Sequence, residues 1–334
     1  MGGVRAEHHE IEPAGGGERL VHRVREGPAG ALEADALHGG LEALAALGLV
    51  DHVGIGGDAA GNNESGRRLH ERMAEERRLQ DSSFAITPHN VNYLLPLTHT
   101  TRTNEEPFAE TEQELQHTEV EFQVSFKVAV NEKPLWRDNG FLYFAYTARS
   151  FWQAYNTDES SPFRDTNHEP EVFLAFTTPF RALGAEVPVF SIGMSHQSNG
   201  RSGIQSRSWH RVYAKATLEY EKFYFSFKPW WRIPEHRKSG PEDATGDDNP
   251  DIHKYLGYFE LRGFRRYGDN ELSLMLRNNL HSDNKGAIEL GYSYPFAKTK
   301  RGYIQLFHGY GETLLDYNHK TTRIGIGIML NNWL

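Results

Sequence analysis

The chain has 334 residues, which is enough for one large barrel or for two ordinary domains. Its net charge of −9 argues against a nucleic-acid partner, and the absence of cysteine excludes a disulfide framework and a thiolate metal site. No run approaches the roughly eighteen consecutive apolar residues that a membrane-spanning helix requires.

Residues 1–82 differ in composition from the rest of the chain. They are rich in Gly, Ala, Glu, Arg and His, and no aromatic residue precedes Phe84. Such a segment cannot bury enough apolar surface to offset the entropy lost on ordering, so we expect a disordered or non-native extension with helical patterns near 31–49 and 65–80. The first ten residues lack the pattern of a secretory signal, so an exported protein would start elsewhere.

From residue 84 onward the sequence consists of short runs in which apolar and polar residues alternate, as in β-strands. The clearest run places Val120, Phe122 and Val124 on one parity and Glu121 and Gln123 on the other. We predict strands at 91–98, 120–130, 141–153, 171–178, 187–198, 207–220, 221–231, 254–264, 271–278, 286–294, 302–311 and 323–330. Alternation of this kind is compatible with low mean hydropathy in a membrane barrel, and the aromatic content of 12% is typical of aromatic girdles.

The connections between these strands also favour a barrel. Tight connections at 131–134 and 296–301 alternate with longer polar ones such as 234–251, as in outer-membrane barrels. The last strand runs almost to the end of the chain at Trp333, which suits a barrel that closes its first strand on its last. We therefore predict an all-β fold, a twelve-stranded antiparallel transmembrane β-barrel over 83–334, with a soluble β-sandwich as the alternative.

A serine and two histidines fall on the apolar side of two of these strands. Ile192 and Met194 share a parity with His196 and Ser198, and His210 falls on the apolar parity of the next strand. In a membrane barrel this side contacts lipid, where polar side chains are costly and usually functional. An enzyme that cuts lipids would place its nucleophile there.

The spacing of these residues suits acyl transfer. A serine needs a base, and the base needs a third group that fixes its tautomer. The Cβ atoms of His196 and Ser198 should be about 6–7 Å apart on one side of the strand. Antiparallel pairing would bring His210 within reach of His196 Nδ1.

Four segments resemble, in the same order, the outer membrane phospholipase A family. They read SSPFRDTN at 160–167, SIGMSHQSNGRSGIQSRSWH at 191–210, DDNPDI at 247–252, and GYGE at 309–312 followed by DYN at 316–318. The resemblance implies a twelve-stranded barrel in the outer membrane of Gram-negative bacteria. It also implies hydrolysis of the acyl esters of phospholipids and lysophospholipids, of both A1 and A2 type, by a calcium-dependent, reversible homodimer.

The resemblance also assigns roles to the three candidate catalytic residues. Ser198 matches the family's nucleophile and His196 its general base. His210 stands where the family has an asparagine. Because a neutral imidazole can still accept a hydrogen bond from His196 Nδ1, we expect a Ser/His/His variant of the catalytic triad.

The resemblance further implies one Ca²⁺ per active site, shared within the dimer. The family's calcium positions fall on Ser160, Arg201, Ser206 and Asp248. Oxygen atoms are the ligands that Ca²⁺ takes, so the arginine would offer its carbonyl. The ion and the backbone amide after the nucleophile would stabilise the oxyanion.

Some positions depart from the family pattern, and other interpretations of the chain stay open. Gln197 and Gly203 stand where the family often has acids, and Ala148 stands where it often has a glutamine in the dimer interface. Ordinary turn chemistry is the alternative for the serine and aspartate positions. A catalytically silent barrel, porin-like or structural, would not need Ser198, and a soluble esterase would keep the Ser/His pair over a closed core.

Overall fold

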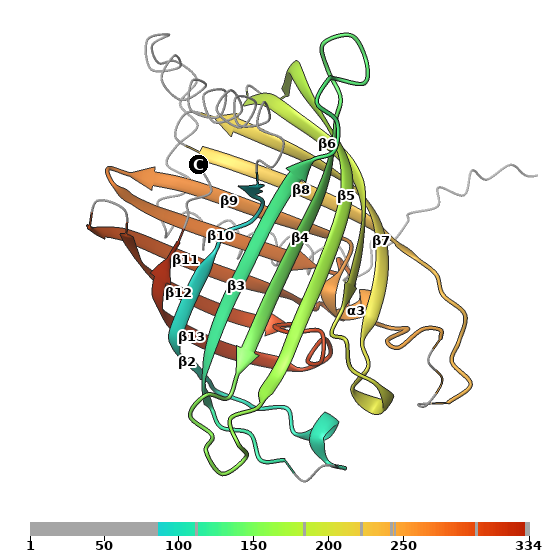
Figure 1. Cartoon of the computed structure of the whole chain (residues 1–334), viewed down its shortest axis with the longest axis vertical. Helices are drawn as coiled ribbons and strands as arrows, with labels where there is room; N and C mark the ends of the chain where they lie inside the picture. The colour runs from blue at the N-terminus through green and yellow to red at the C-terminus, as the bar shows by residue number, and fades with distance from the viewer. Residues whose placement is uncertain are drawn as a thin grey trace, which may run out of the picture. The chain divides into compact units, whose positions relative to one another are not determined.

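The computed structural model describes residues 86–110, 113–182, 185–220, 223–240, 243, 245–297 and 300–330. Within these residues twelve strands, β2 to β13, close into an antiparallel barrel in which each strand pairs with its neighbours in sequence and β13 pairs with β2 (Figure 1). The predicted fold class and strand number are confirmed. The predicted extension over 1–82 and the terminal Trp333 lie outside the described residues.

The barrel strands have the following bounds: β2 Tyr93–Thr100, β3 Thr118–Ala129, β4 Phe141–Trp152, β5 Phe163–Ala182, β6 Ala185–Ser198, β7 Ser208–Tyr220, β8 Phe223–Ile233, β9 Phe259–Tyr267, β10 Asn270–Asn278, β11 Gly286–Ala297, β12 Lys300–Tyr310 and β13 Lys320–Met329. A short strand, β1 (Ile86–Pro88), pairs with β3 beside β2. The described helical turns are η1 (Glu106–Phe108), η2 (Gly203–Gln205) and α3 (His253–Leu256), and none is long or apolar enough to cross a membrane.

Two predicted strand starts were wrong. β5 begins at Phe163 rather than at 171, because its first polar residues, including Arg164 and Asp165, are buried inside the barrel. The segment from residue 254 forms α3 and not a strand. This turn ends at Gly257, whose φ of 72° is left-handed and where a Cβ would lie 2.0 Å from Asn278 O, so β9 begins only at Phe259.

The polarity of the barrel is inverted relative to a water-soluble protein. On β6 the side chains of Ile192 and Met194 are 48% and 55% exposed on the outer side, whereas Ser191 and Ser195 are buried inside. The same alternation places Val172 outside on β5. Apolar residues outside and polar residues inside are the pattern of a barrel that faces lipid.

Ion pairs across the interior join strands that are distant in sequence. The buried guanidinium of Arg323 on β13 pairs with Glu121 on β3 and, at 2.6 Å, with Glu312 in the loop after β12. Arg164 on β5 pairs with Glu119 on β3 at 2.7 Å and with Glu312 at 3.1 Å. Each buried cation is therefore matched by carboxylates from other elements, which a low-dielectric interior requires.

Replacing Arg323 with methionine should destabilise the barrel strongly, because Glu121 and Glu312 would keep buried charges without this partner. We expect a loss of about 3–5 kcal/mol in the free energy of unfolding, measured by urea titration of the refolded protein in lipid or detergent. The matched control is Arg181→Met, which breaks an exposed pair with Glu186 and should cost about 0–1 kcal/mol. Equal losses in the two variants would contradict this account of the interior.

Candidate active site

Three consecutive strands, β5, β6 and β7, position the predicted catalytic residues. The register places His196 opposite His210 and Ser198 opposite Ser208 across β6 and β7. On the other side of β6, Ser198 lies opposite His168 of β5. Because side chains alternate along a strand, His196 and Ser198 lie on the same outer face as Met194. The polar group therefore lies on the lipid-facing side, at the loop end of β6.

The two histidines are in direct contact. Their Nδ1 atoms are 3.2 Å apart, and the ring centroids are 4.5 Å apart with an angle of 33° between the planes. A hydrogen bond at this distance requires one Nδ1 to donate and the other to accept. If His196 Nε2 is to accept a proton from a serine, His196 carries its proton on Nδ1, and His210 Nδ1 is the acceptor.

Ser198 is half-buried at the last position of β6, two residues beyond His196. No hydrogen bond joins its Oγ to His196 within the described part of the chain. Contacts of this kind are often long in the absence of substrate and tighten in the reacting complex. The structure therefore places Ser198 and His196, the predicted nucleophile and base, on one face of β6 without a hydrogen bond between them.

The loop from β6 to β7 is organised by the buried side chain of Asn199. Its Nδ2 donates to Gln205 O at 2.8 Å, and its Oδ1 accepts the backbone N–H of Arg207 at 3.0 Å. Gly200 and Gly203 have φ values of 65° and 61°, in the left-handed region that favours glycine. This loop carries Arg201 and Ser206, the second and third predicted calcium positions.

Two of the four predicted calcium positions meet. Ser206 Oγ donates to Asp248 Oδ2 at 3.0 Å, and Ser208 Oγ donates to the same oxygen at 3.0 Å. Lys238 pairs with the other carboxylate oxygen of Asp248. Ser208 and Lys238 were not singled out from the sequence, since a serine at a strand start and a lysine in a polar loop give no distinctive pattern.

The other two positions do not touch that cluster in the structure. Ser160 is exposed in the turn before β5, with a left-handed φ of 57°. The guanidinium of Arg201 donates to Phe163 O and Arg164 O at 2.7 and 2.8 Å, so its side chain points toward β5. The four positions offer hydroxyl, carboxylate and carbonyl oxygens, which are the types of ligand atom that Ca²⁺ binds. Among the described residues no group of three or more His, Asp or Glu could hold a metal ion.

Glu235, in the loop after β8, is a further neighbour of the histidine pair. Its Oε2 is 3.9 Å from His210 Nε2. Partial burial raises the pKa of this carboxyl, and the nearby His210 opposes that rise. Sequence reasoning missed Glu235, because a residue in a loop has no strand alternation that would place it on one side of the barrel.

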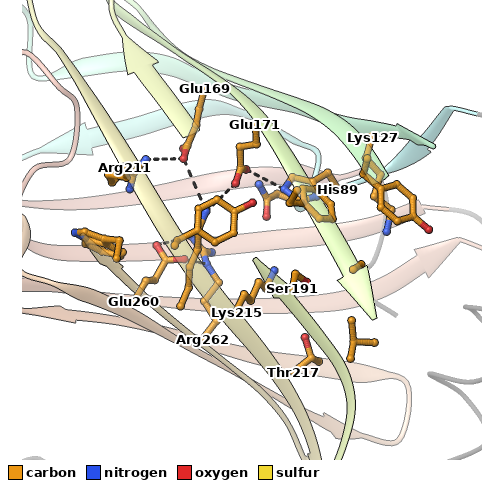
Figure 2. Close-up of a pocket in the computed structure, with 18 of the residues that line it drawn as sticks. His89, Lys127, Glu169, Glu171, Ser191, Arg211, Lys215, Thr217, Glu260 and Arg262 are labelled. Carbon is orange, nitrogen blue, oxygen red and sulfur yellow. Dashed lines mark hydrogen bonds and ion pairs between the residues drawn. The ribbon is translucent and has the colours of Figure 1, made fainter. Parts of the chain in front are cut away.

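A second polar site lies inside the barrel, in a cavity of about 210 Å³ (Figure 2). Its carboxylates are already paired: Glu171 is 2.9 Å from both Lys228 Nζ and His89 Nε2, and Glu169 is 2.5 Å from Arg211. Ser198 and His196 are not among its lining residues. The cavity belongs to the interior ion network, and the candidate active site is separate from it.

Comparison with known proteins identifies the family. Residues 69–330 match the family model of phospholipase A1. The phospholipase A1 of Escherichia coli K12 is 40% identical over 258 residues, covering 75% of this chain and 83% of that protein. The putative phospholipase A1 of Neisseria meningitidis serogroup B is 38% identical over 264 residues, covering 75% of this chain and 66% of that protein.

Solved structures agree with this assignment. The outer membrane phospholipase A of Escherichia coli superposes with a TM-score of 0.69 at 39% identity, over 75% of this chain and all of that one. A Salmonella typhi outer membrane phospholipase dimer with bound calcium gives a TM-score of 0.68 at 38% identity, over 75% of this chain and 94% of that one. The chain therefore belongs to the phospholipase A1 family and is a β-barrel of the bacterial outer membrane.

Proposed function

We propose that this chain is a phospholipase that hydrolyses the acyl esters of phospholipids and lysophospholipids, at both the A1 and the A2 position, with Ser198 as nucleophile. The observation that carries the proposal is the contact between His196 and His210, at 3.2 Å, on the outer face that also holds Ser198. Polar groups in contact with lipid are costly, and a paired histidine next to a serine is the arrangement that acyl transfer requires.

In the proposed mechanism, His196 Nε2 accepts the proton of Ser198 Oγ as that oxygen attacks the ester carbonyl. His196 Nδ1–H donates to His210 Nδ1, which holds the ring in the required tautomer and stabilises the imidazolium that forms. The imidazolium then protonates the leaving alcohol, and a water activated by His196 releases the fatty acid from the acyl-enzyme. The backbone amide of Asn199 is the proposed oxyanion donor, as the amide that follows the nucleophile.

We propose that calcium, one ion per active site, is held by oxygen atoms of Ser160, Arg201, Ser206 and Asp248. The Salmonella typhi relative was solved with calcium bound, and Ser206 and Asp248 are already in contact here. Bound calcium supplies positive charge that stabilises the oxyanion. Because Lys238 pairs with Asp248, the ion and this ammonium group would compete for one carboxylate.

We also propose a reversible homodimer that shares its calcium sites. That Salmonella typhi relative is a dimer, and Ser160 does not reach the Ser206–Asp248 pair within one chain in the described structure. A ligand from a second chain would account for this separation. Ala148, opposite His168 across β4 and β5, offers no hydrogen bond to a partner, so we expect the dimer to be weak.

Fatty acid release from mixed phospholipid–detergent micelles tests the proposed activity. We expect Ser198→Ala to lower the rate by at least about a thousandfold, because no other group would form the acyl-enzyme. The matched control is Ser195→Ala on the same strand, whose hydroxyl is buried inside the barrel, and its rate should stay within about twofold. Acyl-position-labelled substrates would separate A1 from A2 cleavage. A Ser198→Ala variant as active as the wild type would refute the proposal, and an inactive wild type would favour a silent barrel.

The calcium concentration needed for half-maximal activity should rise in one variant and fall in another. Asp248→Asn weakens an anionic ligand and should raise the calcium concentration for half-maximal activity by about tenfold, whereas Lys238→Gln removes the competing ammonium and should lower it by about threefold. Asp138→Asn, in an exposed turn between β3 and β4, is the control. Calorimetric calcium titration should follow the same order. Full activity in excess chelator would contradict a role for calcium.

The pH profile tests the third residue. An imidazolium accepts no hydrogen bond, so protonation of either His196 or His210 should stop the reaction on the acid side. His210→Asn keeps a hydrogen-bond acceptor and removes one of the two imidazoles whose protonation would stop the reaction. We expect a shallower acid limb, with alkaline activity retained within about tenfold, or about 1.4 kcal/mol of barrier. An unchanged acid limb, or a fully active His210→Ala variant, would show that Ser198 and His196 act without His210.

A further inference from the structure

Glu235 is held next to His210 by the pairing of β7 and β8. His210 lies opposite Ile233, the last residue of β8, so the chain that continues past Ile233 passes beside the histidine pair. Glu235 Oε2 is 3.9 Å from His210 Nε2, whereas His210 Nδ1 is 3.2 Å from His196. The two nitrogens of one ring thus face the catalytic base on one side and a carboxylate on the other.

The other charged groups around this carboxylate are engaged elsewhere. Arg232 pairs with Asp247 and donates to Pro250 O at 2.9 Å, and Lys238 pairs with Asp248. Among the described residues, His210 is the one basic side chain with a nitrogen within 4.0 Å of this carboxylate, and the second oxygen of Glu235, Oε1, is buried without a hydrogen bond. His210 is therefore the nearest cationisable group to the carboxylate of Glu235 among the described residues, and Arg232 attracts it less strongly.

The contact between Glu235 and His210 Nε2 bears on which nitrogen of His210 carries the proton. To accept from His196, the His210 ring must carry its proton on Nε2 and leave Nδ1 bare. In the other tautomer two Nδ1–H groups would face each other at 3.2 Å, and the pair would lose its hydrogen bond. A carboxylate beside Nε2 favours the Nε2–H form, directly or through one bridging water, because the partner of one ring nitrogen decides which nitrogen carries the proton.

We propose that Glu235 is a positioning residue that acts through His210, by keeping the His210 proton on Nε2 so that Nδ1 can accept from His196. The inference rests on the proposed function, because it gives His210 the third place in the Ser198–His196 system. An asparagine at this place, as in the resembling family, has no tautomers. The carboxylate is needed because this chain has a histidine there.

A double-mutant cycle on the full-length protein in detergent micelles tests the proposal. Glu235→Ala should lower kcat by about tenfold in the wild-type background, with KM within about twofold, since the loss falls on proton transfer and not on lipid binding. In the His210→Asn background the same change should alter kcat by less than about twofold, because the amide needs no tautomer control. Glu132→Gln, in an exposed turn between β3 and β4, should be neutral in both backgrounds.

A conservative variant keeps the test informative even where alanine impairs folding. Glu235→Asp retains the charge but withdraws it by one methylene, so a smaller loss of about threefold is expected, again only in the presence of His210. Equal losses in both backgrounds would mean a structural role and would overturn the proposal, as would unchanged kcat in the wild-type background. A hydrolytically active Ser198→Ala variant would instead refute the proposed function, so the two failures are distinguishable.

Discussion

Lipid offers no hydrogen-bond partners, so every backbone amide and carbonyl at membrane depth must be satisfied within the protein. This chain meets that constraint with a ring of twelve strands that leaves no open edge, because β13 pairs with β2. A closed ring also fixes the side of each residue. Alternation then sends apolar side chains outward and polar ones inward, and the interior must be neutralised by pairs such as Arg323 with Glu312.

The same constraint separates the two polar sites of the molecule. The interior network around Glu171 is internally paired and holds the strands together, as Figure 2 shows for the cavity. Ser198, His196 and His210 lie on the opposite side of the sheet, where a polar group has no structural need to be. They occur only where β6 ends and β7 begins, next to the segment between β8 and β9 that carries both Glu235 and Asp248. This segment can therefore add charge to the lipid-facing group from outside the strands.

The alternation of apolar and polar residues made the strands, and the side of the sheet on which each side chain lies, largely predictable from the sequence. Period-two alternation located all twelve barrel strands, and the shared parity of His196, Ser198 and His210 placed them on one side before any pairing was known. The alternation pattern missed the start of β5. Polar residues such as Arg164 are typical of exposed loops in a soluble protein, whereas this barrel buries them in its interior. The pattern also failed at α3, where one left-handed glycine delays β9. Contacts from Ser208, Lys238 and Glu235 depend on how loops fold back, and no local pattern encodes that.

The central claim is that the nucleophile lies on the lipid-facing side of the barrel, activated by paired histidines. Its most direct measurement is labelling of the refolded protein with a fluorophosphonate that carries an acyl chain, followed by peptide mass spectrometry. The account predicts a single adduct on Ser198, formed at a rate that falls sharply in His196→Ala and less in His210→Ala. An adduct on another serine, or hydrolysis that continues unchanged while Ser198 is fully modified, would contradict it.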